Sequence, residues 1–408
     1  MTSIDEQLKI ITKGVEEIIG LEELKKKLGE AEKQGRPLIA KLGLDPSAPD
    51  IHLGHAVVLR KLKQLQDLGH KAVIIIGDMT GMVGDPTGKS KTRKQLTPEQ
   101  VAENAETYKK QIFRILDEAK TQVLFNSQWL SKLEFAEVLN LASKITVARM
   151  LEREDFKRRF ESHEAISLHE FFYPLMQAFD SVALMADIEF GGTDQKFNIL
   201  MGRSMQREFG QDAQVAIFMP ILEGTDGRDK MSKSLNNYIG IDEKPEDMYG
   251  KVMSIPDNIV IKYFQLATDI HPDEIEKIRQ LLDSSSVNPR DIKMRLAGEI
   301  TSLYHGGDAA VKAEEHFVRL FQRKEVPEEI PNFVIGQDLH TEKGADIVKV
   351  IVACGAASSS SEARRLISQG AVRINGIKLQ NAVNVILKQG DIIGIGKRFF
   401  IRVSIKGK

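Results

Sequence analysis

The chain is poor in the features that mark secreted, membrane-bound and metal-centred proteins. Its 408 residues include one cysteine, Cys354, so a disulfide within the chain and a cysteine-rich zinc site are both excluded. There is no long hydrophobic run, and residues 1–13 alternate charged with apolar side chains. We therefore expect no signal peptide, no membrane span and a cytoplasmic protein. Cys354 lies in an apolar run and is interpreted as a small core residue.

A large charge of either sign is also missing, but the charge is unevenly distributed. The formal net charge is −1, yet residues 343–408 hold twelve Lys and Arg against three Asp and Glu. A basic tail on an acidic body indicates a nucleic-acid partner, because Lys and Arg bind phosphates with release of counterions. A solvated basic face is the alternative.

The pattern of apolar runs predicts an α/β fold. Short runs without alternation occur at 38–44, 72–76, 123–125, 182–188 and 215–219, and helical patterns at 53–68, 98–117 and 133–153 lie between them. Strands of this kind separated by helices indicate a doubly wound parallel sheet, a Rossmann-like nucleotide-binding architecture. Residues 1–35 are expected to form amphipathic helices.

The composition further divides the chain into four segments. We expect a catalytic Rossmann-like domain at 1–234, a helical domain at 235–325, a linker rich in proline and acidic residues at 326–342, and a small α+β domain at 343–408.

Two short motifs far apart in the sequence contain the candidate catalytic residues. His52-Leu53-Gly54-His55 opens a helical stretch, and Lys230-Met231-Ser232-Lys233-Ser234 lies in a loop rich in glycine and charge. The start of a helix favours an anion, and glycine lets a ligand approach the backbone. Lysines on a flexible loop can move onto phosphates in the transition state and leave afterwards. Together the strings predict an ATP site, which stabilises charge developing on a phosphoryl group.

A third string imitates a phosphate-binding loop. Residues 84–90 end in Gly-Lys-Ser, but three residues instead of four separate the two glycines, and Val83 stands where the first glycine should be. We therefore reject a P-loop NTPase.

Residues 170–182 predict a helix with a polar face. Tyr173, Gln177 and Asp180 recur at i, i+4 and i+7 among Phe, Leu and Met, which suits a small polar ligand; an exposed polar stripe is the alternative. Residues 191–195, Gly-Gly-Thr-Asp-Gln, permit close backbone contact, and Asp194 could bind ribose hydroxyls. For this second segment the alternative is a plain tight turn.

In this order the motifs resemble those of the bacterial-type tyrosyl-tRNA synthetases, which are class I aminoacyl-tRNA synthetases. The resemblance rests on residues 44–52, on the face formed by Tyr173, Gln177 and Asp180 (the Tyr173 face), on residues 191–195, and on the loop that carries Lys230 and Lys233 (the lysine loop). It covers essentially the whole chain. It implies a tyrosine–tRNA ligase that makes tyrosyl-adenylate from L-tyrosine and ATP and then transfers tyrosine to tRNA(Tyr). It also implies a homodimer, for which residues 133–150 are the candidate interface, with buried core as the alternative.

The resemblance also implies roles for individual residues. Tyr173, Gln177 and Asp85 are expected to hold the α-ammonium group of tyrosine. Asp180 is expected to accept the phenolic O–H, and Gln195 to lie near the carboxylate. The ATP-binding residues implied in the same way are Gly43, Asp45, His52, Gly54, His55, Gly192, Asp194, Lys230 and Lys233, of which the two histidines and two lysines form the catalytic group. Magnesium is expected to accompany ATP on its phosphates, with no protein metal site and no tightly bound cofactor.

Two positions depart from the best-known pattern of the family. Leu53 replaces the commoner isoleucine, which changes shape without loss of chemistry. Lys41 stands where one branch of the family has a tyrosine that helps to bind the substrate hydroxyl, so no role is carried onto Lys41. Phenylalanine would leave Asp180 unpaired, and a buried unsatisfied polar group is costly.

The basic tail has a readable motif of its own. Residues 361–376 predict a capped basic helix, a glycine stop and a hairpin that turns at Asn375-Gly376, which resembles the RNA-binding module of ribosomal small-subunit protein four. Phosphate contacts that set affinity more than base choice are expected from Arg364, Arg365, Arg373 and Lys378. By resemblance, residues 235–325 are expected to bind the anticodon arm.

Three other functions compete with this interpretation. The related tryptophan enzyme shares both ATP motifs, but the Tyr173 face and the basic tail argue against it. A non-catalytic RNA-binding protein has no reason to keep both histidines and both lysines. A small-metabolite adenylyl transferase has no use for the tail.

Overall fold

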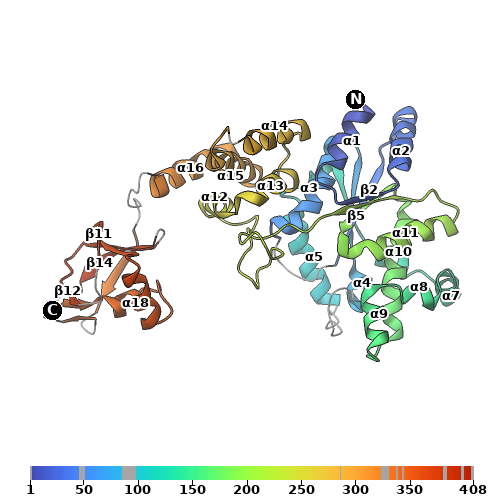
Figure 1. Ribbon diagram of the computed structural model, residues 1–408. Helices are drawn as coiled ribbons and strands as arrows, with labels where there is room; N and C mark the ends of the chain where they lie inside the picture. Colours follow the sequence, from blue (N-terminus) through green and yellow to red (C-terminus); the bar gives the residue numbers. More distant parts are fainter. Residues whose placement is uncertain are drawn as a thin grey trace. The chain divides into compact units, whose positions relative to one another are not determined.

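The computed structural model describes residues 2–45, 51–84, 98–284, 286–322, 330–336, 339–341, 344–379, 384–396 and 399–405. The chain forms two compact units, Met1–Ala310 and Val311–Lys408, whose elements are labelled in Figure 1. Within the described residues, every helix is too short or too polar to cross a bilayer.

A six-stranded sheet forms the centre of the first unit, in the order β1-β6-β5-β2-β3-β4. Its strands are β1 (Glu17–Ile19), β2 (Ile39–Leu44), β3 (Lys71–Ile76), β4 (Thr121–Phe125), β5 (Ile188–Gly192) and β6 (Val215–Met219). Strands β2 to β6 pair in parallel, and β1 joins β6 antiparallel. The order reverses between β2 and β5, and ligands of such sheets bind at the carboxyl ends of the strands at this switch point. The predicted parallel-sheet fold is confirmed.

Helices cover the sheet on both faces, as in other parallel sheets, and nearly every residue of β3 and every residue of β6 is buried. Figure 1 shows α1 and α3 on one side of β2 and β5, with α10 and α11 packed together on the other. The helices of this part are α1 (Ile4–Thr12), α2 (Leu21–Gln34), α3 (Leu53–Asp67), α4 (Asp78–Val83), α5 (Pro98–Ile112), α6 (Ser127–Leu130), α7 (Phe135–Ser143), α8 (Val147–Met150), α9 (Glu154–Glu161), α10 (Phe172–Leu184) and α11 (Lys196–Glu208). Three short 3-10 turns are η1 (Glu118–Lys120), η2 (Leu168–Phe171) and η3 (Thr193–Gln195).

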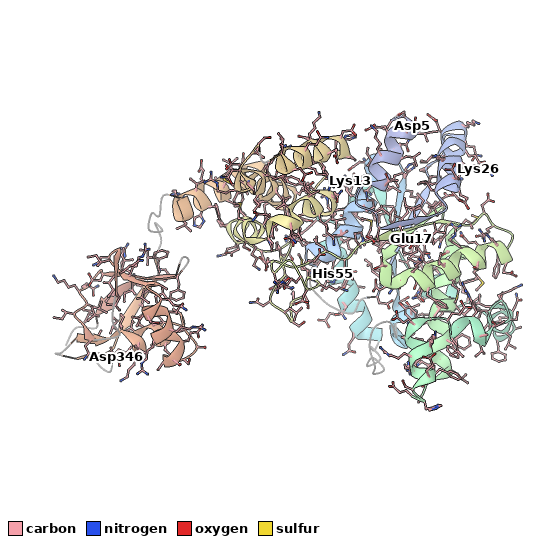
Figure 2. The ribbon with its side chains drawn as sticks, in the orientation of Figure 1. Asp5, Lys13, Glu17, Lys26, His55 and Asp346 are labelled. Atoms are coloured by element: carbon pink, nitrogen blue, oxygen red, sulfur yellow. The ribbon has the colours of Figure 1, made fainter. Side chains whose placement is uncertain are left out.

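The residues after the lysine loop fold as helices and belong to the same compact unit. They form α12 (Pro245–Ser254), η4 (Asp257–Ile259), α13 (Val260–Ala267), α14 (Pro272–Asp283) and α15 (Pro289–His305), and α12, α14 and α15 each begin at a proline, whose fixed φ suits a first helical position. Lys13, labelled in Figure 2, ties α1 to the end of α13, because its ammonium group donates to the carbonyl oxygens of Thr268 (2.7 Å) and Ile270 (3.1 Å). Helix α16 (Gly307–Phe317) and η5 (Val318–Gln322) follow.

In the described residues after Gln322, the second unit combines two small sheets with the helices α17 and α18. One sheet has the order β11-β10-β13-β14-β7 and the other β12-β9-β8. Its elements are β7 (Asn332–Ile335), β8 (His340–Thr341), β9 (Gly344–Asp346), α17 (Ile347–Ala353), α18 (Ser360–Ser368), β10 (Val372–Ile374), β11 (Ile377–Lys378), β12 (Asn384–Val385), β13 (Ile392–Ile395) and β14 (Phe399–Ile405). The hairpin turns at Asn375 and Gly376, with φ of 48° and 83°, and Ser359 caps α18. Strand β7 pairs in parallel with β14, so this sheet takes a strand from within the predicted linker.

Three predictions about elements of the first unit are wrong. The strand predicted at 182–188 is the end of α10, and the strand begins only at Ile188, after Met185 closes the helix with a φ of 50°. The single helix predicted at 133–153 is broken into α7 and α8, because Thr146 caps a new helix by accepting from the Arg149 N–H at 3.1 Å. Residues 1–35, predicted as helical throughout, contain strand β1.

Candidate active site

A cavity of about 320 Å³ opens at the carboxyl ends of β2, β3, β5 and β6. It is lined by these predicted site residues: Gly43, Asp45, His52, Gly54, His55, Tyr173, Gln177, Asp180, Gly192, Asp194, Gln195 and Lys230. Of the remaining residues predicted for substrate and ATP, Lys233 lies farther along the lysine loop, and Asp85 lies outside the described residues.

The two histidines stack at the start of α3. Their ring centroids are 3.8 Å apart at an angle of 21°, and the His52 backbone N–H points to Nδ1 of His55 at 3.5 Å. Figure 2 labels His55 in this first turn. The buried Nδ1 of His52 has no hydrogen-bond partner among the described residues. A Cβ on Gly54 would meet the His52 ring at 3.0 Å, so only glycine fits comfortably between this ring and the loop.

Both imidazoles are neutral at physiological pH. Burial, the neighbouring His55 and then Lys230 and Lys233 lower the pKa of His52 to about 3. Burial and the same two lysines lower the pKa of His55 to about 4. The site therefore offers neutral N–H donors beside two ammonium groups, an environment that favours a polyanion.

Short backbone contacts bring the histidine and lysine motifs together. The Leu53 N–H donates to the carbonyl oxygen of Ile239 at 2.9 Å, and the Ile241 N–H donates to that of Ile51 at 3.3 Å. Between them, Met231 is buried and its sulfur accepts from the Gly54 N–H at 3.3 Å. The lysine loop is thus fixed to the first turn of α3.

Asn237 organises the inside of the lysine loop. Its Oδ1 accepts from the Ser232 N–H at 2.8 Å, and its Nδ2 donates to Asp226 Oδ2 at 2.7 Å and to the Lys230 carbonyl oxygen at 3.3 Å. A Cβ on Gly224 would collide with the Asn237 side chain, so this glycine is required for the close approach. Asn237 therefore sets the shape of the segment that carries both lysines.

Lys233 lies over an aromatic ring that faces the histidines. Its Nζ is 5.6 Å from the centre of the Tyr238 ring, within cation–π range, and the same ring is 6.5 Å from that of His52. Lys251 Nζ is 4.6 Å from the Tyr238 ring centre. Lys233 itself is exposed.

Asp45 and Tyr173 are joined where β2 ends. The Tyr173 hydroxyl donates to Asp45 Oδ2 at 2.8 Å, and the Thr80 hydroxyl donates to Asp45 Oδ1 at 3.0 Å. A Cβ on Gly77 would collide with both Thr80 and Asp45. The carboxylate of Asp45 is therefore held at the cavity wall between β2, α4 and α10.

Asp180 is a buried carboxylate with two neutral donors. The indole Nε1 of Trp129 donates to Oδ1 at 2.8 Å, and Nδ2 of Asn126 donates to Oδ2 at 3.4 Å. Burial raises the pKa of Asp180 to about 7, against the lowering effects of the nearby Lys41 charge and of the two donors, whereas Glu189 raises it further. Asp180 thus has room to accept one more proton donor from the cavity.

A buried ion pair lies next to the tyrosine face of α10. Lys41 and Glu189 are opposite one another on β2 and β5, 3.2 Å apart, with side chains 1% and 2% exposed. Lys41 Nζ also donates to Ser181 Oγ (2.5 Å) and to the carbonyl oxygen of Gln177 (3.4 Å). Glu189 accepts from Gln177 Nε2 at 3.3 Å, from Ser181 Oγ at 3.2 Å and from Gln214 Nε2.

The segment Gly191 to Gln195 forms the turn between β5 and α11. A Cβ on Gly191 would meet Ile199 at 2.5 Å, and one on Gly192 would collide with the Asp194 carboxylate. Gln195 Oε1 accepts from Asn198 Nδ2 at 3.1 Å. These glycines allow the polar side chains of Asp194 and Gln195 to lie at the cavity.

The predicted RNA-contacting residues lie in the second unit. Arg364 and Arg365 are exposed on α18, and Arg373 and Lys378 are exposed on the hairpin. Arg373 and Lys378 are directly opposite across the strands, where like charges are destabilising. Such a pair suits the binding of an anion.

Sequence reasoning missed several residues that shape this site. They are Thr80, Asn126, Trp129, Glu189, Asn237 and Tyr238, which are single residues scattered over different elements. The one available signal was rarity, because Trp129 is the only tryptophan in the chain.

Two family models match the chain. Residues 33–322 match the model described as class I tRNA synthetases (W and Y), and residues 324–402 match the tyrosine–tRNA ligase SYY-like C-terminal domain. Among curated proteins, the chain is 62% identical over 406 residues to tyrosine–tRNA ligase 2 of Clostridium acetobutylicum, with all of both chains covered. It is 51% identical over 401 residues to the tyrosine–tRNA ligase of Thermotoga maritima, with 98% of each covered.

Solved structures give the same result for the larger part of the chain. The tyrosyl-tRNA synthetase of Archaeoglobus fulgidus complexed with L-tyrosine is 26% identical, with a TM-score of 0.60 over 77% of this chain and all of that one. A C-terminally truncated mitochondrial tyrosyl-tRNA synthetase of Aspergillus nidulans matches 79% of this chain with a TM-score of 0.63 at 24% identity, which bears on the fold alone.

Proposed function

The chain belongs to the class I tRNA synthetases that handle tyrosine, and from that membership we propose how its residues divide the work of the reaction. The activity is tyrosine–tRNA ligation: L-tyrosine and ATP give tyrosyl-adenylate and pyrophosphate, and tyrosine then passes to the 3′ end of its tRNA. One observation supports the proposed division, namely that a single cavity is lined both by the histidine and lysine motifs and by Asp180.

At the ATP end, His52, His55, Lys230 and Lys233 would stabilise the triphosphate. The carboxylate of tyrosine attacks the α-phosphate, the bond from that phosphorus to the bridging oxygen breaks, and pyrophosphate leaves. Negative charge grows on the departing group, where the neutral imidazoles donate hydrogen bonds and the ammonium groups supply positive charge. Adenosine would lie against backbone and polar side chains at the strand ends, namely Gly43, Asp45, Gly54, Gly192 and Asp194.

At the tyrosine end, Asp180 would accept the phenolic O–H. Its two internal donors, Trp129 and Asn126, leave acceptor capacity on both oxygens. Tyr173, Gln177 and Asp85 would hold the α-ammonium group. Gln195 would lie near the carboxylate that attacks ATP.

Magnesium would enter on the phosphates of ATP as part of the substrate. Within the described residues no three His, Cys, Asp or Glu side chains form a metal-binding group. The cavity wall nearest the lysine motif carries ammonium and imidazole groups, so we propose that the phosphates supply the ligands of the ion. No tightly bound cofactor is proposed.

tRNA(Tyr) would bind through its phosphates to the basic face of the second unit. This face consists of Arg364, Arg365, Arg373 and Lys378, all exposed. The mutual repulsion of Arg373 and Lys378 is relieved when a phosphate lies between them. Because the partner is a tRNA, we propose that the protein works in the cytoplasm.

A second copy of the chain would cover an apolar surface on α7, α8 and η2. Phe135, Leu139, Val147 and Leu168 are 77%, 55%, 63% and 79% exposed, and their elements pack on one apolar cluster. Exposed apolar residues in such number mark an interface. Leu168→Asp should yield a monomer in sedimentation, whereas Leu281→Asp on α14 should not. A Leu168→Asp variant that stays dimeric would contradict this interface.

Amino-acid-dependent exchange of labelled pyrophosphate into ATP tests the proposed roles. Tyrosine should support exchange, while phenylalanine and tryptophan should not. Lys233→Ala should lose exchange, and Lys33→Ala, at an exposed lysine of α2, serves as the matched control. Exchange with tryptophan would point to the related tryptophan enzyme, and no exchange with any amino acid to a non-catalytic RNA-binding protein.

A further inference from the structure

We propose that the buried pair Lys41–Glu189 orients the side-chain amide of Gln177, so that the amide oxygen faces the substrate ammonium group. This inference rests on the assignment of Gln177 to the ammonium site made above. Lys41 and Glu189 are not among the residues that line the cavity, so they are positioning residues.

The argument begins with the two ends of a glutamine amide. The NH₂ group can only donate and the carbonyl oxygen can only accept, whereas an ammonium group can only donate. Gln177 is therefore useful to the substrate only with its oxygen toward the cavity. Glu189 Oε1 lies 3.3 Å from Gln177 Nε2, and a carboxylate accepts the NH₂ group but repels the amide oxygen. The contact with the Glu189 carboxylate thus selects one of the two amide orientations.

Lys41 holds the carboxylate of Glu189 in place. The two residues are opposite one another in the parallel ladder, and both side chains are almost completely buried. Lys41 Nζ also donates to the backbone carbonyl oxygen of Gln177 at 3.4 Å. The pair therefore holds Gln177 at both its backbone and its side chain.

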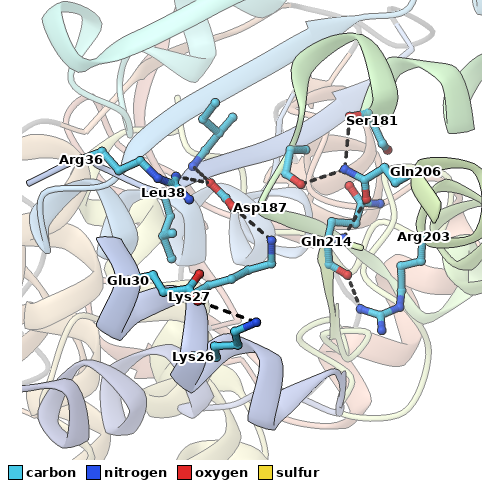
Figure 3. Close-up of polar contacts among 12 residues, drawn as sticks. Lys26, Lys27, Glu30, Arg36, Leu38, Ser181, Asp187, Arg203, Gln206 and Gln214 are labelled. Atoms are coloured by element: carbon cyan, nitrogen blue, oxygen red, sulfur yellow. Dashed lines mark hydrogen bonds and ion pairs between the residues drawn. The ribbon is translucent and has the colours of Figure 1, made fainter. Parts of the chain in front are cut away.

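The other carboxylate oxygen of Glu189 is held by two further hydrogen bonds. Its Oε2 accepts from Ser181 Oγ and from Gln214 Nε2. Gln214 is in turn held by Gln206 and Arg203, as Figure 3 shows. A buried ion pair can often be replaced by apolar residues without loss of stability. Both members of this pair bond to Gln177 and Ser181 on the substrate-facing helix α10, which is better explained by orientation of that helix and its amide.

Three ligands and three variants test the inference. The ligands are tyrosine, tyramine, which keeps the ammonium group but has no carboxylate, and 3-(4-hydroxyphenyl)propionate, which keeps the carboxylate but has no amino group. The variants of the full chain are Glu189→Gln, Lys41→Met/Glu189→Gln and Gln177→Ala. The double variant leaves no unpaired buried charge and covers the case in which Glu189→Gln fails to fold. Dissociation constants are read from the fluorescence of Trp129, the only tryptophan, excited beyond the absorption of the phenols.

Removal of the Lys41 or Glu189 charge also acts on Asp180, but Asp180 binds the phenol that all three ligands share. Glu189→Gln and the double variant should therefore weaken tyrosine and tyramine by about tenfold more than the propionate, the loss of one hydrogen bond to a charged group. Equal weakening of all three ligands, or none, overturns the inference. Gln177→Ala separates the two proposals. If it discriminates against the amino ligands while Glu189→Gln does not, the inference fails and the proposed function stands. If Gln177→Ala weakens all three ligands equally, the assignment of Gln177 fails and the inference fails with it.

Discussion

Replacing Trp129 by phenylalanine should shift the pH at which tyrosine binds. The substitution keeps an aromatic ring but deletes the indole N–H, which donates to Asp180 Oδ1 at 2.8 Å. Asp180 then keeps only the longer contact to Asn126 at 3.4 Å and the charge of Lys41 nearby. The carboxylate remains as buried as before, so its ionised form becomes less stable.

The size of the shift follows from the strength of the lost bond. A hydrogen bond to a charged group contributes about 1.5–3 kcal/mol, which corresponds to about one to two pKa units. The pKa of Asp180 is already raised to about 7 by burial, so the variant should titrate above that value. Because the ionised form accepts the phenol, the KM for tyrosine should rise about tenfold at neutral pH and recover as the pH is raised.

The assay is pyrophosphate exchange over a range of tyrosine concentrations and pH values. The KM for ATP is the internal control, since Trp129 is not among the residues that line the cavity. A cavity left by the smaller ring would raise the KM for tyrosine equally at every pH. A variant whose pH profile matches that of the unsubstituted protein would refute the reasoning.

Three further outcomes are expected. Between its ordinary pKa of 3.8 and about 7, folded Asp180 binds more protons than unfolded Asp180, so the free energy of unfolding falls as the pH rises. Asp180→Asn removes this loss and should stabilise the fold above neutral pH by up to about 4 kcal/mol. Urea unfolding of both proteins at about pH 5 and about pH 8 measures the difference. Asn237→Ala should lower kcat for exchange about tenfold with little change in the KM for tyrosine, because it frees the lysine loop; equal changes in both constants would contradict this role. Arg373→Ala/Lys378→Ala should weaken tRNA binding and reduce the salt slope by about 2 while leaving exchange unchanged, and an unchanged slope would exclude phosphate contacts there.

The parallel sheet was predictable because its buried strands are continuous apolar runs. The strand predicted at 215–219 is found there, as β6, with all five residues buried. The same signal fails at 182–188, where the apolar end of α10 runs into the start of β5. A buried helix end and a buried strand look alike over a few residues, and Met185 in a left-handed conformation separates them without a glycine to mark the place. Strand β1 has three residues and joins the sheet only at its edge, too short for any periodicity.

The candidate site was predictable only where its residues are close in sequence. The histidine and lysine strings and the face that begins at Tyr173 are local patterns, and the fold brings them to one cavity. The partners of Asp180 come from the segment after β4, and Glu189 comes from β5. Such contacts arise from tertiary packing, and nothing in their local sequence indicates them. Lys41 stood alone in the sequence, and its partner became visible only with the strand register.

The pairing of residues 51–53 with 239–241 couples the position of the lysine loop to that of the first turn of α3. The lysine loop is held at Met231, whose N–H donates to the carbonyl oxygen of Leu222 at 3.1 Å, and at Ile239, whose carbonyl oxygen accepts from the Leu53 N–H at 2.9 Å. A deletion of one residue between Leu222 and Ile239 should therefore displace the first turn of α3. Mild heating that breaks the hydrogen bonds between residues 51–53 and 239–241 should abolish adenylate synthesis while the sheet remains folded.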